Sequence, residues 1–318
     1  MEEKDRKPGY INLYNSGELE RRSTILWKIL ENCTLCPREC HRNRLKGEKG
    51  FCGMDADIVV SSIHPHFGEE PELVGNRIYS ILGRGGSGTI FLAGCNFLCV
   101  FCQNWEISHL KQGEKITPLE LADGMIYLQE RGCHNINFVT PTHFVPQIVK
   151  SLKEAVKKGL RLPLVYNCGG YEKVETLKLL EGIFDIYMPD IKFSSPEVAK
   201  KLANAPDYFE VCKKAVKEMH RQVGDLKVDE RGIAYRGLLV RHLVLPGNLA
   251  GSREVLKFIA KEISKDTYVN IMFQYRPEYK AGDFEELSRR PTLSEYLQVI
   301  KIAREFGLYR GFGENFTF

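Results

Sequence analysis

Three cysteines stand close together in the stretch GCNFLCVFC, at positions 95, 99 and 102 of a 318-residue chain. Thiolates are the usual protein ligands of iron–sulfur clusters, and a four-iron cluster held by protein alone needs four of them. Three thiolates in one loop would leave one iron open to an exogenous ligand, as a catalytic zinc keeps one position free. Cys95, Cys99 and Cys102 therefore predict an open [4Fe–4S] cluster. The alternative is a structural zinc site with a distant fourth ligand.

A second group of cysteines precedes this loop. Cys33, Cys36, Cys40 and Cys52 follow the spacing C-x2-C-x3-C-x11-C in a basic, glycine-containing segment. Four thiolates make a closed site, which suits either a tetrahedral zinc ion or a second [4Fe–4S] cluster. Either would stabilise a segment too small to fold alone. Zinc would indicate a structural cap or a partner-binding site, and a cluster would indicate electron relay or substrate docking. Both alternatives stay open at this stage.

Composition bounds the environment of the protein. Seven of the ten cysteines are clustered, which favours metal chemistry in a reducing compartment over the disulfide framework of a small secreted chain. Residues 1–17 are polar and lack the apolar core of a signal peptide, and no apolar run is long enough to span a membrane. We therefore expect a cytoplasmic protein with no membrane partner. The net charge of +4 is too small to indicate nucleic-acid binding.

Short apolar runs alternate with amphipathic helical patterns from about residue 57 onwards, which implies a parallel sheet with right-handed crossovers. Six such runs rather than eight predict an α/β fold with a partial (β/α)6 barrel over residues 57–318, whose reactive groups gather at the carboxyl ends of the strands. Residues 1–56 would form a small cysteine-rich extension containing a helix at 17–31, with Ser16 as its N-cap. The six predicted strands are 89–94, 135–140, 162–167, 184–189, 238–245 and 269–273.

The stretch CNFLCVFC resembles the CxxxCxxC signature of the radical S-adenosylmethionine (SAM) enzymes. Together with DIYMPDIKF and VRHLVLPGN, it is similar to the pyruvate formate-lyase activating enzymes across nearly all of residues 85–275, and CTLCPREC resembles an uncharacterised branch of their relatives. The resemblance implies that the open iron binds SAM. The reduced cluster then cleaves SAM to a 5′-deoxyadenosyl radical, which abstracts hydrogen from a substrate. It also implies an electron donor such as flavodoxin or ferredoxin.

The same resemblance implies roles for residues that follow the first two predicted strands. Phe101, just before the third cysteine of the loop, would pack on the adenine of SAM. Thr140, Pro141 and Thr142 stand where the family has a GGEP-like turn, and their main-chain carbonyls can accept the hydrogen bonds of the SAM amino group without glycines. His143 is either a polar helix-start residue or a substrate contact.

Residues after the third and fourth predicted strands are implied to complete the SAM site. Asn167 stands where activating enzymes often have an aspartate, and Gly169 and Gly170 would permit a close backbone approach. Asp190 and Lys192 would lie beside the methionine part of SAM and serve in catalysis. Their i, i+2 spacing on a strand points both side chains to one face. The alternative for this pair is a surface ion pair.

Later strands contribute further candidates. Arg241 matches an arginine that contacts SAM in relatives, and a guanidinium suits a carboxylate because its fork is bidentate. The adjacent His242 should face the opposite way and serve the structure. Gln274, Tyr275 and Arg276 follow the sixth predicted strand and would face the pocket.

The leading hypothesis for the function is hydrogen abstraction from a glycine of a glycyl radical enzyme. The alternative is radical modification of a small molecule, lipid or RNA, because the GGEP turn is missing, extra cysteines are present and the sixth strand is altered. A non-catalytic iron–sulfur or zinc scaffold is the least favoured, since it leaves Asp190, Lys192 and Arg241 without a purpose. The segment HPHFGEEP (64–71) is interpreted as a proline-shaped loop beside the cluster rather than a source of metal ligands.

Overall fold

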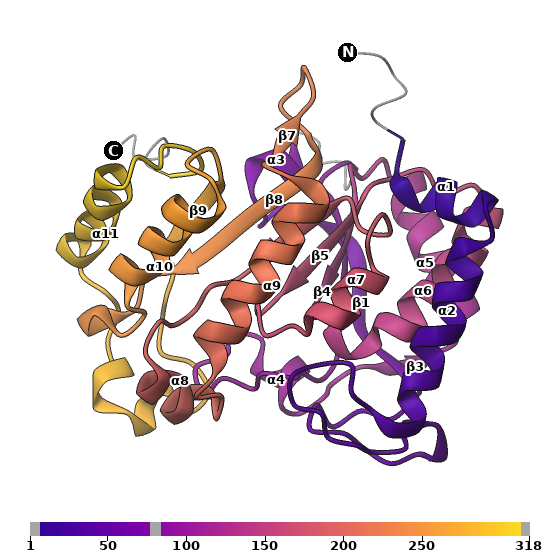
Figure 1. Ribbon diagram of the computed structural model, residues 1–318, viewed down its shortest axis with the longest axis horizontal. Helices are drawn as coiled ribbons and strands as arrows, with labels where there is room; N and C mark the ends of the chain where they lie inside the picture. Colours follow the sequence, from indigo (N-terminus) through magenta and orange to yellow (C-terminus); the bar gives the residue numbers. More distant parts are fainter. Residues whose placement is uncertain (1–6, 77–83, 313–318) are drawn as a thin grey trace.

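Six parallel strands form the centre of the computed structural model, which describes residues 7–76 and 84–312 (Figure 1). Their order in the sheet is β2-β4-β5-β6-β8, with β9 paired to β8. Every predicted strand overlaps one of them, which confirms the α/β fold and the partial (β/α)6 barrel. Their bounds are β2 (Ser87–Leu92), β4 (Ile136–Val139), β5 (Leu164–Cys168), β6 (Ile186–Pro189), β8 (Ala234–Leu243) and β9 (Tyr268–Met272).

Helices cover the outside of this sheet (Figure 1). Two of the long ones begin with a capping box, at Thr117 and Thr292, whose hydroxyls accept the N–H of a glutamate three residues on. The long helices bury apolar side chains against the strands or against neighbouring helices, and this packing rather than helix propensity stabilises them. The helices are α3 (Pro71–Val74), α4 (Trp105–Ser108), α5 (Pro118–Glu130), α6 (Val145–Lys157), α7 (Val174–Leu179), α8 (Pro196–Ala203), α9 (Tyr208–Val223), α10 (Ser252–Phe258) and α11 (Leu293–Glu305).

Short helical turns connect these elements. Six turns within the described residues are 3-10 turns, and the segment Ile259–Ile263 continues α10 as a π-helical turn. The turn at Thr142–Phe144 leads directly into α6, so it fixes the residues that follow β4. The 3-10 turns are Leu30–Asn32, Arg44–Lys46, Thr142–Phe144, Pro246–Asn248, Ala281–Asp283 and Glu285–Leu287.

Three strands were not predicted. β1 (Ile58–His66) runs antiparallel to β2, β3 (Glu114–Ile116) pairs with the start of β1, and β7 (Lys227–Val228) pairs with β8. The interpretation of 64–71 as a loop is therefore wrong for its first residues. Pro65 is tolerated in β1 because β3 pairs only with Ile58 to Val60, so the second edge of β1 carries no strand partner at the proline among the described residues.

The predicted helix at 17–31 is two helices, α1 (Gly9–Asn15) and α2 (Glu18–Ile29). Ser16 ends α1 instead of capping α2, and its hydroxyl donates to the Leu13 carbonyl. Gly17 precedes α2 in the left-handed region, with φ 78°, where a side chain would be strained. Buried side chains of α1 and α2, such as Tyr10 and Leu26, belong to the same hydrophobic core as the barrel.

Candidate active site

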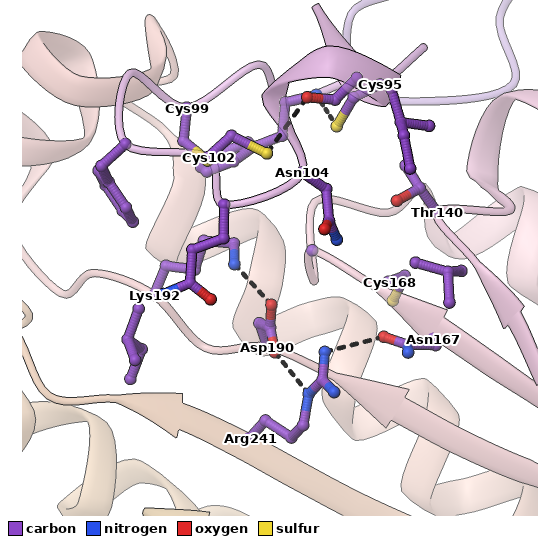
Figure 2. Close-up of a pocket in the computed structure, with 18 of the residues that line it drawn as sticks. Cys95, Cys99, Cys102, Asn104, Thr140, Asn167, Cys168, Asp190, Lys192 and Arg241 are labelled. Atoms are coloured by element: carbon purple, nitrogen blue, oxygen red, sulfur yellow. Dashed lines mark hydrogen bonds and ion pairs between the residues drawn. The ribbon is translucent and has the colours of Figure 1, made fainter. Parts of the chain in front are cut away.

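The carboxyl ends of the parallel strands surround one cavity of about 180 Å³, and the three-cysteine loop forms part of its wall (Figure 2). The loop follows β2, and polar residues come from the ends of β4, β5, β6 and β8. This is the end of the sheet where a parallel α/β fold places reactive groups. The lining includes Cys95, Cys99, Phe101, Cys102, Thr140, Asn167, Cys168, Gly169, Asp190, Lys192, Arg241 and Gln274.

Hydrogen bonds orient the sulfurs of the loop. The backbone N–H of Phe97 donates to Cys95 Sγ over 3.3 Å, and the Ser108 hydroxyl donates to Cys102 Sγ over 3.2 Å. A hydrogen bond from Cys99 lowers the pKa of Cys102 to about 6, whereas burial raises the pKa of Cys95 to about 11. Leu98 has φ 54°, so the loop contains a strained residue between two of its cysteines.

The chemistry of this donor set fits an iron–sulfur cluster with one open iron. Three soft thiols face one cavity, and the nearby Lys192 ammonium acts to lower the pKa of each thiol against the effect of burial. Within residues 7–76 and 84–312, no three His, Cys, Asp or Glu side chains are arranged around a shared metal position. Cys99 and Cys102 instead share a hydrogen bond, which iron binding to both sulfurs would replace.

A fourth cysteine, Cys168, lines the same cavity from the end of β5. Figure 2 shows it beside Asn167, apart from the loop sulfurs. Its thiol donates a hydrogen bond to the carboxylate of Glu172, which is buried. Cys168 is thus engaged on the opposite wall, which leaves the loop with three sulfurs of its own.

A chain of charges crosses the cavity floor. The Lys192 ammonium lies 2.5 Å from Asp190 Oδ2, and Arg241 Nε donates to Asp190 Oδ1 over 2.9 Å (Figure 2). Burial alone would raise the pKa of Asp190, but Lys192 and Arg241 hold it below its ordinary value. The Asp190 and Lys192 side chains are only 16% and 17% exposed, so they are not a surface ion pair.

Arg241 is held by three acceptors of the protein itself. Besides Asp190, its Nη2 donates to Asn167 Oδ1 over 3.0 Å and its Nη1 donates to Glu69 Oε2 over 3.2 Å. All three guanidinium nitrogens are therefore occupied, at least in part, by this chain. Glu69 does not line this cavity, and it was missed from the sequence because only the antiparallel strand β1 brings it to Arg241.

The three residues in place of the GGEP-like turn have different surroundings. Thr140 lines the cavity with φ 61°, and its N–H donates to the Asn167 carbonyl over 2.8 Å. The Thr142 hydroxyl donates to buried Glu172 over 2.6 Å, and neither Pro141 nor Thr142 belongs to the cavity lining. Only Thr140 of the three is thus in a position to contact a molecule in the cavity.

Of the two glycines after β5, Gly170 carries the steric requirement. Its φ is 75°, and a Cβ there would lie 2.4 Å from the Asp190 carbonyl oxygen, whereas a Cβ on Gly169 would meet only ordinary contacts. The hydroxyl of Tyr208, on α9, accepts the N–H of Lys192 over 2.9 Å and lies 2.9 Å from the Gly169 carbonyl. Tyr208 therefore ties the ends of β5 and β6 together, a role that its helical position did not reveal.

Two histidines next to the cavity serve the structure. His143 is buried in the turn before α6, its Nε2 lies 2.7 Å from the Ala93 carbonyl oxygen and it does not line the cavity, which favours the helix-start alternative over the substrate contact. His242 is also buried and points away from the cavity, with hydrogen bonds to the Ile191 carbonyl and the Ser252 hydroxyl. Its predicted structural role is consistent with these contacts.

The apolar wall and the sixth parallel strand complete the cavity. Phe101 lies at the wall with its ring edge-on to Tyr275. Gln274 lines the cavity, whereas Tyr275 is buried and its hydroxyl donates to the Leu287 carbonyl. Arg276 is 57% exposed and pairs with a neighbouring glutamate. Only Gln274 of the three residues expected after β9 therefore lines the cavity.

The four N-terminal cysteines converge in a separate place. A Cβ added to Gly50 would lie 3.0 Å from Cys40 Sγ and 3.6 Å from Cys52 Sγ. Burial raises the pKa of Cys33, Cys36 and Cys52, and in each case another thiol of the four raises it further. Each of these three thiols is thus within electrostatic reach of at least one other thiol of the segment, although no three of them surround one metal position in the described residues.

This segment packs directly against the three-cysteine loop. Gly94, which precedes Cys95, has φ 78°, and a Cβ there would lie 2.7 Å from the Cys52 carbonyl oxygen. Arg38 donates to the Asn96 carbonyl over 2.9 Å and lies 4.0 Å from the centre of the Phe51 ring. The two cysteine groups therefore share backbone contacts and one bridging arginine.

Comparison with known proteins agrees with this geometry. The model of the Radical SAM superfamily matches residues 89–231. "Uncharacterized protein MJ0674" of Methanocaldococcus jannaschii is 33% identical over 300 residues, which cover 91% of this chain and 79% of that protein. The chain belongs to the radical SAM superfamily. A second relative of this radical SAM protein, "Uncharacterized protein MJ0808" of Methanocaldococcus jannaschii, is 26% identical over 289 residues, covering 87% and 78% of the two chains.

A solved structure of a histidine-tagged protein, "anSMEcpe with bound AdoMet", matches with a TM-score of 0.42 and 12% identity, over 67% of this chain and 55% of that one. Among the helices that the structure describes, none has both the length and the apolar character needed to cross a membrane.

Proposed function

We propose that this radical SAM protein holds a [4Fe–4S] cluster through Cys95, Cys99 and Cys102, binds SAM in the adjoining cavity and abstracts hydrogen from a substrate. The observation that carries the proposal is that three thiols of one loop face a cavity whose opposite wall is polar. When bound, the cluster supplies one electron, delivered by a low-potential cytoplasmic donor such as flavodoxin or ferredoxin, to split SAM into methionine and a 5′-deoxyadenosyl radical.

The residues of the chain contribute binding, orientation and charge. The Lys192 ammonium favours the ionised form of the three loop thiols, which is the form that binds iron. Asp190 holds both Lys192 and Arg241 in place. The apolar Phe101 would accept the adenine, and Thr140 and Asn167 present polar groups on the opposite wall.

Two substrate classes fit this function. The first is a glycine of a partner glycyl radical enzyme, as the similarity to the pyruvate formate-lyase activating enzymes implies. The second is a small molecule, and one observation favours it: a second, acidic cavity adjoins the first at Arg241. A flat docking face for a protein loop would not require a buried carboxylate pair.

We further propose that Cys33, Cys36, Cys40 and Cys52 form a closed metal site, either zinc or a second [4Fe–4S] cluster. The contact between Cys52 and Gly94 supports a role in bracing the loop of the open cluster. Metal analysis of protein in which the three loop cysteines are alanine distinguishes zinc from iron at the N-terminal site.

The test of the function is anaerobic reconstitution with iron, sulfide, SAM and a strong reductant. We expect methionine and 5′-deoxyadenosine to form in equal amounts with wild-type protein. Formation of neither product, by protein that has taken up four or more irons, would contradict the proposal. A glycine-centred radical signal on a co-purified partner protein would decide in favour of the first substrate class.

A further inference from the structure

A second cavity of about 170 Å³ adjoins the first at Arg241 and is not lined by the loop cysteines. We call it the acidic cavity. It is lined by Glu69, Glu70 and Asn270, and it shares Arg241, Met272 and Gln274 with the first cavity. A molecule in the acidic cavity would therefore lie next to a molecule in the first cavity.

Glu70 is the unusual residue of the acidic cavity. It is 4% exposed, and its Oε1 accepts a hydrogen bond from Asn270 Nδ2 over 2.8 Å. Its Oε2 is buried and has no hydrogen-bond partner among the residues that the structure describes. A buried carboxylate oxygen without a partner is costly, because the desolvation of its charge is not offset. Glu70 lines the acidic cavity, so the structure leaves a buried carboxylate with one unsatisfied acceptor at its wall.

The cations nearby do not supply that partner. Arg241 is bonded to Glu69, Asp190 and Asn167, and Glu69 in turn accepts a hydrogen bond from Asn137 over 3.1 Å. Three carboxylates, those of Glu69, Glu70 and Asp190, thus stand against the two cations Lys192 and Arg241. The group has an excess of one formal negative charge.

The titration of Glu69 is consistent with this excess. Burial raises its pKa to about 7, Arg241 opposes the rise, and the carboxylate of Glu70 adds to it. A positively charged group placed in the acidic cavity would stabilise both carboxylates in their ionised form.

We propose that the acidic cavity binds the ammonium group of an organic amine substrate, with the carboxylate of Glu70 as its anchor. This inference rests on the proposed function and names the substrate class for it. An ammonium group offers three donors, which suit a carboxylate oxygen without a partner. The rest of the amine would extend past Arg241 and Met272 into the first cavity, where hydrogen abstraction takes place.

A bare metal ion fits the acidic cavity less well. Hard cations take six or more oxygen ligands, whereas two of the four carboxylate oxygens here already accept hydrogen bonds from Asn137 and Asn270 and a third accepts one from Arg241. The volume of about 170 Å³ also has room for several heavy atoms beyond a single ion. An organic cation therefore accounts for both the charge and the space.

The test uses the full reconstituted chain with SAM present and n-butylamine as the probe. Butanol and butyrate serve as neutral and anionic probes of similar size, and binding is measured by ligand-observed NMR titration. We expect butylamine to bind more tightly than either. Glu70→Gln should weaken butylamine binding by about ten- to a hundredfold, because the charge of the anchor is lost while its shape is kept.

Glu72→Gln is the matched control. Glu72 is two residues away, accepts a hydrogen bond from the Tyr268 hydroxyl and does not line the acidic cavity, so butylamine affinity should not change. Thermal melting of both variants shows whether they are folded. In wild-type protein, butylamine should also raise the melting temperature more than butanol does, which tests binding without any variant.

Equal binding of butylamine and butanol by wild-type protein would overturn the inference, as would unchanged butylamine affinity in folded Glu70→Gln. Displacement of bound butylamine by potassium ions would also overturn the inference, in favour of a metal ion in the acidic cavity. If wild-type protein cleaves SAM but binds no amine, this inference fails and the proposed function stands. If it binds the amine but never cleaves SAM, the proposed function fails, and the acidic cavity is left as an amine-binding site without a radical reaction.

Discussion

The two cysteine groups of this chain differ in their access to the cavity. The sulfurs of Cys95, Cys99 and Cys102 line a cavity that a small molecule can enter. The four cysteines of the N-terminal segment line neither of the two cavities described above, and Cys33 Sγ lies 4.0 Å from Arg44, which is 1% exposed. Three thiols at a cavity would leave a coordination position for chemistry, whereas the closed four-thiol site that we propose for the N-terminal segment would stabilise the fold. The number of ligands and their access to the cavity, rather than the ligand type, separate the two roles.

Removing the sulfurs of the cavity should have the largest effect on activity. The triple change of Cys95, Cys99 and Cys102 to alanine should reduce the formation of 5′-deoxyadenosine to background, because the loop then has no thiol to hold the catalytic iron. Cys168→Ser is the control and should retain the cluster, since Cys168 bonds Glu172 on the other wall. Product chromatography and iron analysis measure both. Loss of the cluster in Cys168→Ser would show that the site is closed.

Removing sulfurs of the four-cysteine segment should act on stability instead. Cys36→Ser combined with Cys40→Ser should abolish the N-terminal metal and lower the free energy of unfolding by more than about 5 kcal/mol, because metal binding contributes directly to folding in small metal-bound segments. Denaturant unfolding of anaerobically purified protein measures the change. Unchanged stability together with unchanged metal content would contradict a closed metal site.

Arg44 offers a finer test of the same segment. It donates to the carbonyls of Asp55 and His143 and lies 4.0 Å from Cys33 Sγ. Arg44→Met should lower the free energy of unfolding by about 3 kcal/mol, because buried acceptors lose a charged donor. Arg42→Met, at an exposed position, should change it by less than about 0.5 kcal/mol. Equal losses of unfolding free energy in the two variants would contradict a stabilising role of Arg44.

The smallest expected effect is on thiol ionisation in metal-free protein. Because Cys99 lowers the pKa of Cys102 to about 6, alkylation of Cys102 should be half-maximal near pH 6 and slow at lower pH, where the thiol is protonated. Cys99→Ala should move that midpoint to higher pH. Cys36, whose pKa burial raises, should react only in more alkaline solution. Mass spectrometry of protein treated with iodoacetamide measures alkylation of each cysteine at each pH. The same pH dependence for Cys102 and Cys36 would contradict this contrast.

The sequence predicted what depends on local pattern. The spacing of the cysteines, the six apolar runs and the i, i+2 pair of Asp190 and Lys192 are each contained within a few residues, and the structure places the runs in one parallel sheet and the pair on one wall. Helix and strand periods are local properties, so such features can be read before any long-range contact is known.

The rest depends on contacts between distant residues. Glu69 and Glu70 reach Arg241 and Asn270 only because β1 runs antiparallel to β2, and a strand pairing of that kind leaves no local mark in the sequence. Arg38 and Arg44 stand in a segment that reads as a basic loop, yet both are held by carbonyls of the barrel. Tyr208 occupies a buried helix position, and the helical pattern alone does not show that its hydroxyl bonds residues at the ends of β5 and β6.

The central claim is that one iron of the cluster held by Cys95, Cys99 and Cys102 is left for SAM. Electron–nuclear double resonance of the reduced wild-type protein, with SAM labelled with 15N at its amino group, measures this directly. The account predicts a hyperfine coupling from the label that disappears when unlabelled SAM replaces it. A reduced cluster that shows no coupling to the label, at SAM concentrations that saturate binding, would contradict the account.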